Sequence, residues 1–278
     1  MRNWIKDKYV VLTGASGGIG RELCKLLVSK YGANVIGVGR NEEKMRSLQA
    51  ELGEHAHRFS YKLFDVSVKE NWQAFARELQ EKELSPSLLI NNAGAFPTFR
   101  KLKDTPSEVA ERIMQVNYFS AVYGVETILP LLKGDKKDKP ALVNVSSCAA
   151  LCTVVGTGVY SASKAALKGY TEALQLEQKG KTYVGLICPG TTATDLFSGD
   201  ENTKNSALDL VAMRADKMAK KIAKKILKKK KRAVLGWDAK CMTFAAKIMP
   251  VKGPALICGI MKASKSKVFK EVFTNEEV

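Results

Sequence analysis

The sequence has few of the residues that build metal sites. It contains only two histidines, His55 and His57, and its six cysteines, at positions 24, 148, 152, 188, 241 and 258, form no Cys-x-x-Cys pair. We therefore expect no metal site and interpret the cysteines as free, packed thiols of a reducing compartment. This pattern favours a cytoplasmic protein.

Long apolar runs are also lacking. The longest candidate, GPALICGIM (253–261), falls far short of the roughly 20 apolar residues that a membrane-spanning helix needs. The first residues, MRNWIKDKYVVLTG, carry four charges before the first apolar run, so we expect no secretory signal.

Acidic residues are scarce relative to basic ones. The chain has 45 Lys and Arg against 28 Asp and Glu, a formal charge of +17. Ten of the basic residues lie in KMAKKIAKKILKKKKR (217–232), which holds no acid, and the other 35 leave a balance of +7. Such a run suits a nucleic-acid or membrane surface, or only the solvated face of a helix.

The lysine run also contains an apolar stripe of helical period and no aromatic residue. Without aromatic side chains for stacking, a nucleic-acid partner is not expected. We interpret the lysines first of all as the solvent-exposed face of an amphipathic helix. Its apolar residues, spaced three and four apart, would pack on the core: Met218, Ala219, Ile222, Ala223, Ile226 and Leu227.

Short apolar runs alternate with helical patterns along the chain. Strands are expected at 8–14, 33–40, 60–66, 87–94, 140–147, 182–190 and 233–236, and helices at 18–30, 41–52, 69–82, 107–132 and 161–178. Strands that are apolar throughout are buried on both faces. The pattern predicts an α/β fold with a doubly wound parallel sheet, the Rossmann plan, and helices on both faces.

This organisation suggests one large unit and an extension. We expect residues 1–236 to form the dinucleotide-binding and catalytic domain, with a mobile flap at 195–216. Residues 237–278 mix apolar stretches with lysines. They would cover the sheet edge or substrate site, form a subunit interface, or, as the less favoured alternative, contact an anionic membrane surface.

A glycine-rich turn, TGASGGIG (13–20), joins the first strand to the first helix. Its backbone N–H groups can approach a pyrophosphate at a helix N-terminus, although a tight turn without a ligand is the alternative.

The second strand ends at Gly39 and Arg40, where an acid would select an unmodified ribose. A guanidinium there predicts NADP(H), unless Arg40 is simply solvent-exposed.

The segment YSASK (160–164) places Tyr160 and Lys164 one helical turn apart. An ammonium group beside the phenol would lower its pKa from about 10, so that Tyr160 serves as a general acid and base. Ser147 ends the fifth strand and can donate to a substrate oxygen. Asn117 lies within a helix, where a water chain from its amide to Lys164 would carry protons. Alone, Tyr-x-x-x-Lys occurs by chance in many helices.

Taken together, these residues resemble the short-chain dehydrogenase/reductase family of the single-domain type. The matching motifs are TGASGGIG, Asp65–Val66, NNAG (91–94), Asn117, Ser147, Tyr160, Lys164, PG (189–190) and Thr194. They occur in the family's order and cover residues 8 to about 195.

The resemblance implies a role for each motif. Tyr160 would be the catalytic acid and base, supported by a set that also positions substrate and relays protons: Asn117, Ser147 and Lys164. The cofactor would contact the glycine turn, the two residues that hold its 2′-phosphate, the residues beside its adenosine, the Tyr–Lys pair and the loop after the sixth strand. These residues are Gly14, Ser16, Gly18, Ile19, Gly20, Arg40, Asp65, Val66, Asn92, Tyr160, Lys164, Pro189, Gly190, Thr192 and Thr194. The chain has Gly17 where NADP-preferring relatives often carry a basic residue, so the preference depends on Ser16 and Arg40.

We therefore expect an NADP(H)-dependent oxidoreductase that interconverts a secondary alcohol and a ketone. Apolar residues would either wall a site for a bulky steroid, bile acid or lipid, or fill the core: Leu151, Val154, Val155, Leu196, Phe197, Leu208, Leu210, Val211 and Met213. The alternative is a non-catalytic NADP(H) sensor or scaffold. A homo-oligomer, dimer or tetramer, is expected, and Cys148 is interpreted as a packing residue rather than a redox switch.

Overall fold

The computed structural model describes residues 2–194, 212–264 and 266–273. Its main sheet has seven parallel strands in the order β3-β2-β1-β4-β5-β6-β9. The strands are β1 (Tyr9–Thr13), β2 (Asn34–Gly39), β3 (Phe59–Leu63), β4 (Leu88–Asn91), β5 (Ala141–Val145), β6 (Tyr183–Pro189) and β9 (Arg232–Leu235). The predicted doubly wound parallel sheet is confirmed.

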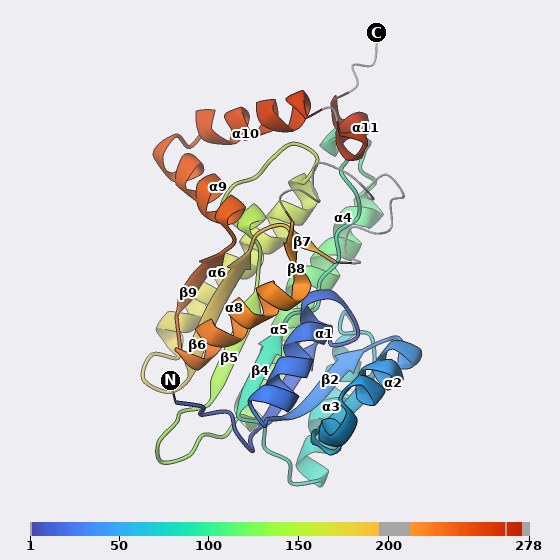
Figure 1. The fold of residues 1–278 in the computed structure, drawn as a ribbon, viewed down its shortest axis with the longest axis vertical. Coiled ribbons are helices and arrows are strands. Elements are labelled where there is room, and N and C mark those ends of the chain that lie inside the picture. Colours follow the sequence, from blue (N-terminus) through green and yellow to red (C-terminus); the bar gives the residue numbers. More distant parts are fainter. Residues whose placement is uncertain (1, 195–211, 265, 274–278) are drawn as a thin grey trace.

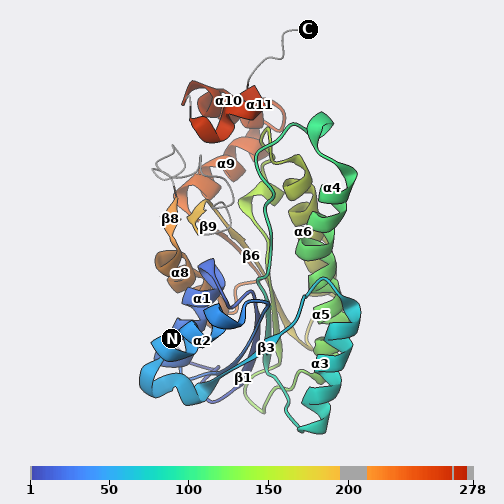
Figure 2. The same ribbon diagram turned by 90° about the vertical axis from the view of Figure 1, so that its right-hand side faces the viewer.

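Helices cover both faces of this sheet (Figures 1 and 2). One face carries α1 (Gly18–Lys25), α2 (Glu42–Glu51) and α8 (Ala215–Leu227), and the other carries α3 (Lys69–Glu81), α4 (Ser107–Met114), α5 (Ser120–Ile128) and α6 (Gly158–Glu177). Each face has its own buried cluster, because strand side chains point alternately to the two sides. β1 and β4 lie at the point where strand order reverses, and their carboxyl ends open toward the candidate site.

Local sequence explains several element boundaries. The Asn41 side chain caps α2 by accepting a hydrogen bond from Lys44 N at 2.8 Å, as expected for an Asn cap. The helix predicted at 107–132 is divided into α4, a π-helical turn at Gln115–Phe119, and α5. A π turn adds one residue to a helical turn, which period counting over an amphipathic pattern does not detect.

The predicted flap and extension differ from expectation in part. Residues 195–211 of the flap lie outside the described residues. Beyond them, Met213–Arg214 forms β8, which pairs with β7 (Thr192–Ala193), and α8 begins at Ala215. A mobile flap at this place stays a prediction. The interrupted apolar stretches after Gly236 form two helices, α9 (Trp237–Ile248) and α10 (Lys252–Ala263), followed by η9 (Lys267–Phe269) and α11 (Lys270–Phe273). These elements lie beyond the carboxyl ends of the strands (Figure 1). The division at residue 236 stays a prediction.

In the described part of the chain, no helix is long and apolar enough to cross a membrane.

Candidate active site

The glycine-rich turn lies between β1 and α1, against the loop that follows β4. Gly14 and Gly18 have φ values of +69° and +51°, which side chains other than glycine rarely adopt. A Cβ added to Gly14 would lie 3.0 Å from Ala93 Cα, and one added to Gly20 would overlap the Gly14 carbonyl. The close approach of backbone in this turn therefore requires glycine, and it leaves N–H groups at the start of α1 for an anion.

Asn92 and Thr13 lock this turn to β4. Thr13 Oγ1 accepts hydrogen bonds from Asn92 N and Ala93 N, both at 2.9 Å, and Asn92 Nδ2 donates to Thr13 O at 3.0 Å. The predicted adenosine-side residue Asn92 thus also holds two strand ends together. Ile19 is partly buried against the core below the turn.

Arg40 lies at the end of β2, where the 2′-phosphate contact was predicted. Its side chain is 68% exposed, and its only ion pair among the described residues is with Asp65 Oδ2, at 3.4 Å. A Cβ on Gly39 would lie 3.1 Å from Ser16 Oγ and 2.6 Å from Met45 Cε. A carboxylate at position 39 therefore has little room, and Ser16 and Arg40 line the same end of the strand.

Asp65 follows β3 and has several polar partners. Burial would raise its pKa, but hydrogen bonds from the Ser67 hydroxyl and backbone N–H, together with the Arg112 guanidinium, outweigh burial and hold the pKa well below its usual range. The carboxylate is an ionised acceptor at neutral pH. Val66 is buried, and its carbonyl accepts the Trp72 indole N–H at 2.9 Å.

Ser147 and Tyr160 meet at the carboxyl end of β5. Ser147 is buried and Tyr160 lies in the first turn of α6, partly exposed. Burial raises the pKa of Tyr160 to about 12, and a hydrogen bond with the Ser147 side chain acts in the opposite direction. The expected lowering of this pKa by Lys164 is not found, and the largest cause of the shift is the desolvation of the phenolate.

Lys164 lies one turn further along α6 and is 3% exposed. Its Nζ is 5.9 Å from the centroid of the Tyr160 ring and donates to Val145 O at 3.3 Å. Burial lowers the pKa of Lys164 to about 8. The ammonium is thus still the major form at pH 7.

Asn117 lies in the π turn between α4 and α5. Its Nδ2 donates to Ala95 O at 2.9 Å and to Ser163 Oγ at 3.0 Å, and its Oδ1 accepts from Ala95 N at 2.7 Å. The buried amide is satisfied by these protein groups, whereas we expected a water partner. A Cβ on Gly94 would lie 3.1 Å from Lys164 Nζ and 3.2 Å from Asn117 Oδ1, so both side chains flank this glycine. A proton relay through Asn117 stays a prediction.

The loop after β6 closes the site from the other side. Pro189 ends β6, and Thr192 Oγ1 donates to Gly190 O at 3.0 Å. A Cβ on Gly18 would lie 3.1 Å from Thr194 Cβ, so Thr194 lies over the glycine turn. The loop is held by Asp238 of α9, whose Oδ2 accepts a hydrogen bond from Thr191 N at 2.6 Å.

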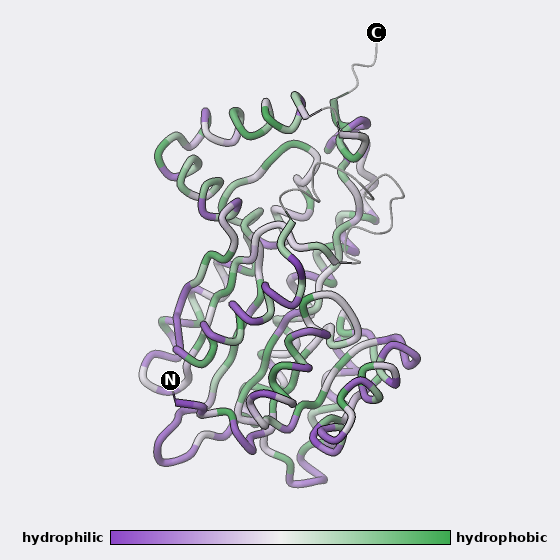
Figure 3. Tube along the Cα trace, in the orientation of Figure 1, coloured by the Kyte–Doolittle hydropathy of each residue, from purple (hydrophilic) through white to green (hydrophobic). Residues whose placement is uncertain are grey.

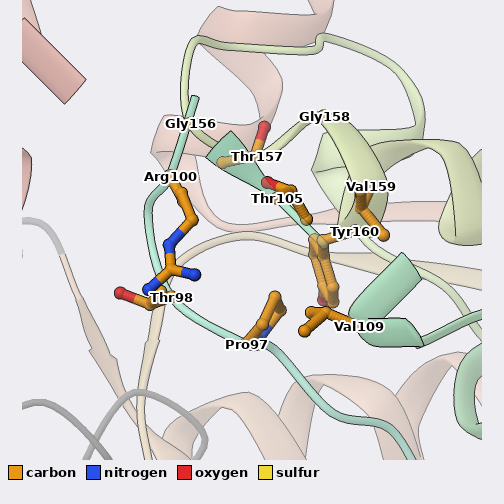
Figure 4. A pocket seen from close by; sticks show the side chains of 10 residues that line it. All are labelled: Pro97, Thr98, Arg100, Thr105, Val109, Gly156, Thr157, Gly158, Val159 and Tyr160. Atoms are coloured by element: carbon orange, nitrogen blue, oxygen red, sulfur yellow. The ribbon is translucent and has the colours of Figure 1, made fainter. Parts of the chain in front are cut away.

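A pocket of about 200 Å³ adjoins Tyr160 (Figure 4). Its walls come from the segment after β4, from α4 and from the residues just before Tyr160: Pro97, Thr98, Arg100, Thr105, Val109, Gly156, Thr157, Gly158 and Val159. Leu151, Val154 and Val155, predicted as walls, do not line it. The other predicted wall residues from 196 to 211 lie outside the described residues, and Met213 packs against the core.

Sequence reasoning missed three residues of the site. The Phe96 ring packs edge-on against Tyr160, with centroids 5.1 Å apart, Thr13 joins the two strand ends, and Asp238 holds the loop after β6. Thr13 stands at the start of the glycine motif, which was a usable signal. Phe96 and Asp238 follow no periodic pattern, and nothing in the sequence marked them.

Cys148, next to Ser147, is buried, and burial raises the pKa of its thiol to about 12. An unreactive thiol fits the packing interpretation. Among residues 2–194, 212–264 and 266–273, no group of His, Cys, Asp or Glu could hold a metal ion.

Comparisons with known proteins agree with this geometry. The profile of the short chain dehydrogenase family matches residues 8–205. The chain belongs to this family. The uncharacterized oxidoreductase YciK of Escherichia coli (strain K12) is 32% identical over 68% of this chain and 75% of its own length.

Two further proteins bear on the chemistry. The 3beta-hydroxysteroid dehydrogenase of Mediterraneibacter gnavus is 29% identical over 76% of this chain and 73% of its own length. A solved structure from Shigella flexneri 2a str. 301, complexed with NADP, is 28% identical, with a TM-score of 0.70, and covers 78% of this chain and 90% of that one. The expected nicotinamide dinucleotide cofactor agrees with the family. As a member of this family, the chain is an oxidoreductase.

Proposed function

We propose that this protein is an NADP(H)-dependent oxidoreductase that interconverts a secondary alcohol and a ketone. The observation that carries the proposal is the convergence of Ser147, Tyr160 and Lys164 at the carboxyl end of β5, beside a glycine turn built for a dinucleotide. When bound, the cofactor would supply or accept the hydride. The chain's own residues would bind, orient and move the proton.

The cofactor-binding surface fits a phosphorylated dinucleotide. A pyrophosphate would lie at the N-terminus of α1, with Gly14, Gly18 and Gly20 permitting close approach. Ser16 and Arg40 would hold the 2′-phosphate, and Asp65 would accept a hydrogen bond from the adenine amino group. The exposed and weakly paired Arg40 guanidinium supports NADP(H) over NAD(H).

We propose that Tyr160 donates its proton to the substrate oxygen during reduction. With a pKa of about 12 it is protonated at neutral pH, the form that a general acid needs. Ser147 would donate a hydrogen bond to the same oxygen. Lys164 would stabilise the phenolate that remains and pass a proton back to it.

The substrate would be a carbonyl compound with an apolar body. Support comes from the rings and aliphatic groups around Tyr160, namely Phe96, Pro97, Val109 and Val159, and from the relative named as a 3beta-hydroxysteroid dehydrogenase. The threonines of the pocket and Arg100 would contact a polar substituent of such a molecule.

A screen of ketones with NADPH and with NADH tests the proposal, with steroids, bile acids and lipid ketones included. For the best substrate, Tyr160→Phe should lower kcat by about 100- to 10,000-fold, because it removes the general acid. Binding of NADPH, followed by its fluorescence, should persist. Tyr170→Phe, on the same helix but outside the site, is the matched control.

The outcome that contradicts the proposal is turnover in Tyr160→Phe close to that of the Tyr170→Phe control. Tight NADPH binding without turnover of any carbonyl compound would instead favour the alternative, a non-catalytic sensor or scaffold.

A further inference from the structure

The two C-terminal helices expose a concentration of large apolar side chains. Thirteen large hydrophobic residues are exposed in the described chain, and seven of them lie between positions 237 and 260. Trp237 is 61%, Phe244 65% and Val251 83% exposed. Scattered exposed apolar residues are ordinary, but a gathering of this kind on one hairpin marks an interaction surface. We call α9, α10 and the turn between them the α9–α10 hairpin.

The exposed apolar residues share one face of each helix. In α9, Trp237, Phe244 and Ile248 recur at helical spacing, and in α10, Leu256 and Ile260 are one turn apart. The opposite faces are occupied: α9 packs on β9 and on the short turn Cys148–Ala150, and α10 packs on α9. The apolar faces are thus the sides of the two helices that these contacts leave exposed.

The exposed charge of this hairpin has one sign. Between positions 237 and 263 the only acid is Asp238, which is buried and hydrogen-bonded to Thr191 N. The segment has four lysines, and all of them are exposed: Lys240, Lys247, Lys252 and Lys262. Hydrophobic and hydrophilic stretches lie close together along α9 and α10 in Figure 3.

An exposed apolar face on a segment with four exposed lysines suits an anionic lipid surface better than a second copy of the chain. A symmetric pair of hairpins would bring eight lysines together without an exposed acid from the same segment to offset them. A bilayer with anionic headgroups meets the lysines with opposite charge, and its interfacial region accepts Trp, Phe, Ile and Leu side chains. We propose that the α9–α10 hairpin docks this protein on the surface of an anionic bilayer.

The inner side of the same hairpin touches the candidate active site. Asp238 holds the loop after β6, and Cys258 Sγ of α10 accepts a hydrogen bond from Val155 N, at 3.3 Å, in the segment between Ser147 and Tyr160. A docked hairpin therefore brings the rim of the site to the lipid surface. An apolar substrate dissolved in the bilayer would reach the site without crossing water.

Flotation with vesicles tests the docking surface and needs no substrate. Vesicles of phosphatidylcholine alone are compared with vesicles that also contain phosphatidylglycerol. The wild-type chain should float only with the anionic vesicles. Replacing Phe244, Ile248, Leu256 and Ile260 together by Ser should weaken binding at least ~10-fold, because binding scales with buried apolar area.

A second pair of variants separates the hairpin from charge in general. Changing Lys240, Lys247, Lys252 and Lys262 to Gln should also weaken binding at least ~10-fold. The matched control changes four exposed lysines to Gln and so removes the same charge: Lys217, Lys221 and Lys224 of α8, and Lys228 at its C-cap. It should change binding by less than ~3-fold, since those lysines do not belong to the hairpin that docks.

Tryptophan emission gives an independent measurement. Trp4 and Trp72 are buried, so a blue shift on adding anionic vesicles reports Trp237 and should vanish in Trp237→Phe.

Three results would overturn the proposal. The first is no vesicle binding of the wild-type chain at low salt. The second is an equal loss of vesicle binding in the α8 and the hairpin lysine variants. The third is unchanged vesicle binding in the Ser variant together with dissociation of a dimer to monomers.

Discussion

Lys164 carries its charge at a thermodynamic cost. It is buried without a carboxylate partner among the described residues, and burial lowers its pKa from 10.5 to about 8. Between these two pH values the unfolded chain binds more protons than the folded one, so the stability of the wild type rises with pH across this window. Below pH 8 the full cost of the buried ammonium is present.

Lys164→Met should therefore stabilise the fold while it abolishes turnover. We expect the free energy of unfolding at pH 7 to rise by about 1–3 kcal/mol, because an unpaired buried charge is replaced by an apolar chain of similar length. The gain should shrink as pH rises from about 8 to about 10.5. Urea unfolding at several pH values measures this, and a variant less stable than the wild type at pH 7 would refute the explanation.

Arg40 makes a prediction about cofactor choice. Arg40→Leu should weaken NADPH binding about 10- to 100-fold, the usual range for losing a charge-assisted contact, and leave NADH binding nearly unchanged. Isothermal titration calorimetry with both cofactors measures the change in NADPH affinity and the change in NADH affinity. Arg46→Leu is the matched control, since its guanidinium is also exposed (71%) and pairs with Glu42 on α2. Equal losses for both cofactors would rule out a 2′-phosphate contact.

Among the elements, α8 shows the structural role of the lysine run. Its apolar stripe, including Ile222, is buried against α1 and the sheet, whereas Lys220, Lys221 and Lys224 are exposed. Asp216 in the first turn and the lysines of the last turn complement the helix dipole. The run is first of all the solvated face of a core helix.

This arrangement predicts unequal costs on the two faces of α8. Ile222→Ala should lower the free energy of unfolding by about 2–5 kcal/mol, through lost burial and a residual cavity. Lys221→Gln should change it by no more than about 0.5 kcal/mol. Chemical denaturation of the two variants distinguishes them. A comparable cost at Lys221 would mean that the charged face has a structural role.

The elements also show what could be predicted. Strands that are apolar throughout, an Asn cap and an apolar stripe at helical spacing are local signals, and the sheet, α2 and α8 follow them closely. The π turn at Gln115–Phe119 was not predictable, because an inserted residue leaves the amphipathic pattern almost unchanged. The helices after Gly236 were not predicted either, because Pro250, Gly253 and Pro254 interrupt the apolar pattern between α9 and the first turn of α10.

At the scale of the whole molecule, parallel strands explain why the site assembles. Gly14, Asn92, Ser147 and Gly190 follow four different strands, and parallel order brings all four strand ends to one edge. The motif residues were predictable for this reason. The raised pKa of Tyr160 was not, since it depends on burial by Phe96 and its surroundings rather than on the spacing to Lys164.

The most direct test of the account follows the hydride itself. The ketone that turns over best is reduced with NADPH doubly deuterated at the nicotinamide C4 position, and the product is analysed by mass spectrometry and NMR. The account predicts one deuterium at the carbinol carbon for each NADPH consumed. An alcohol without deuterium, or tight NADPH binding with no ketone reduced, would contradict it.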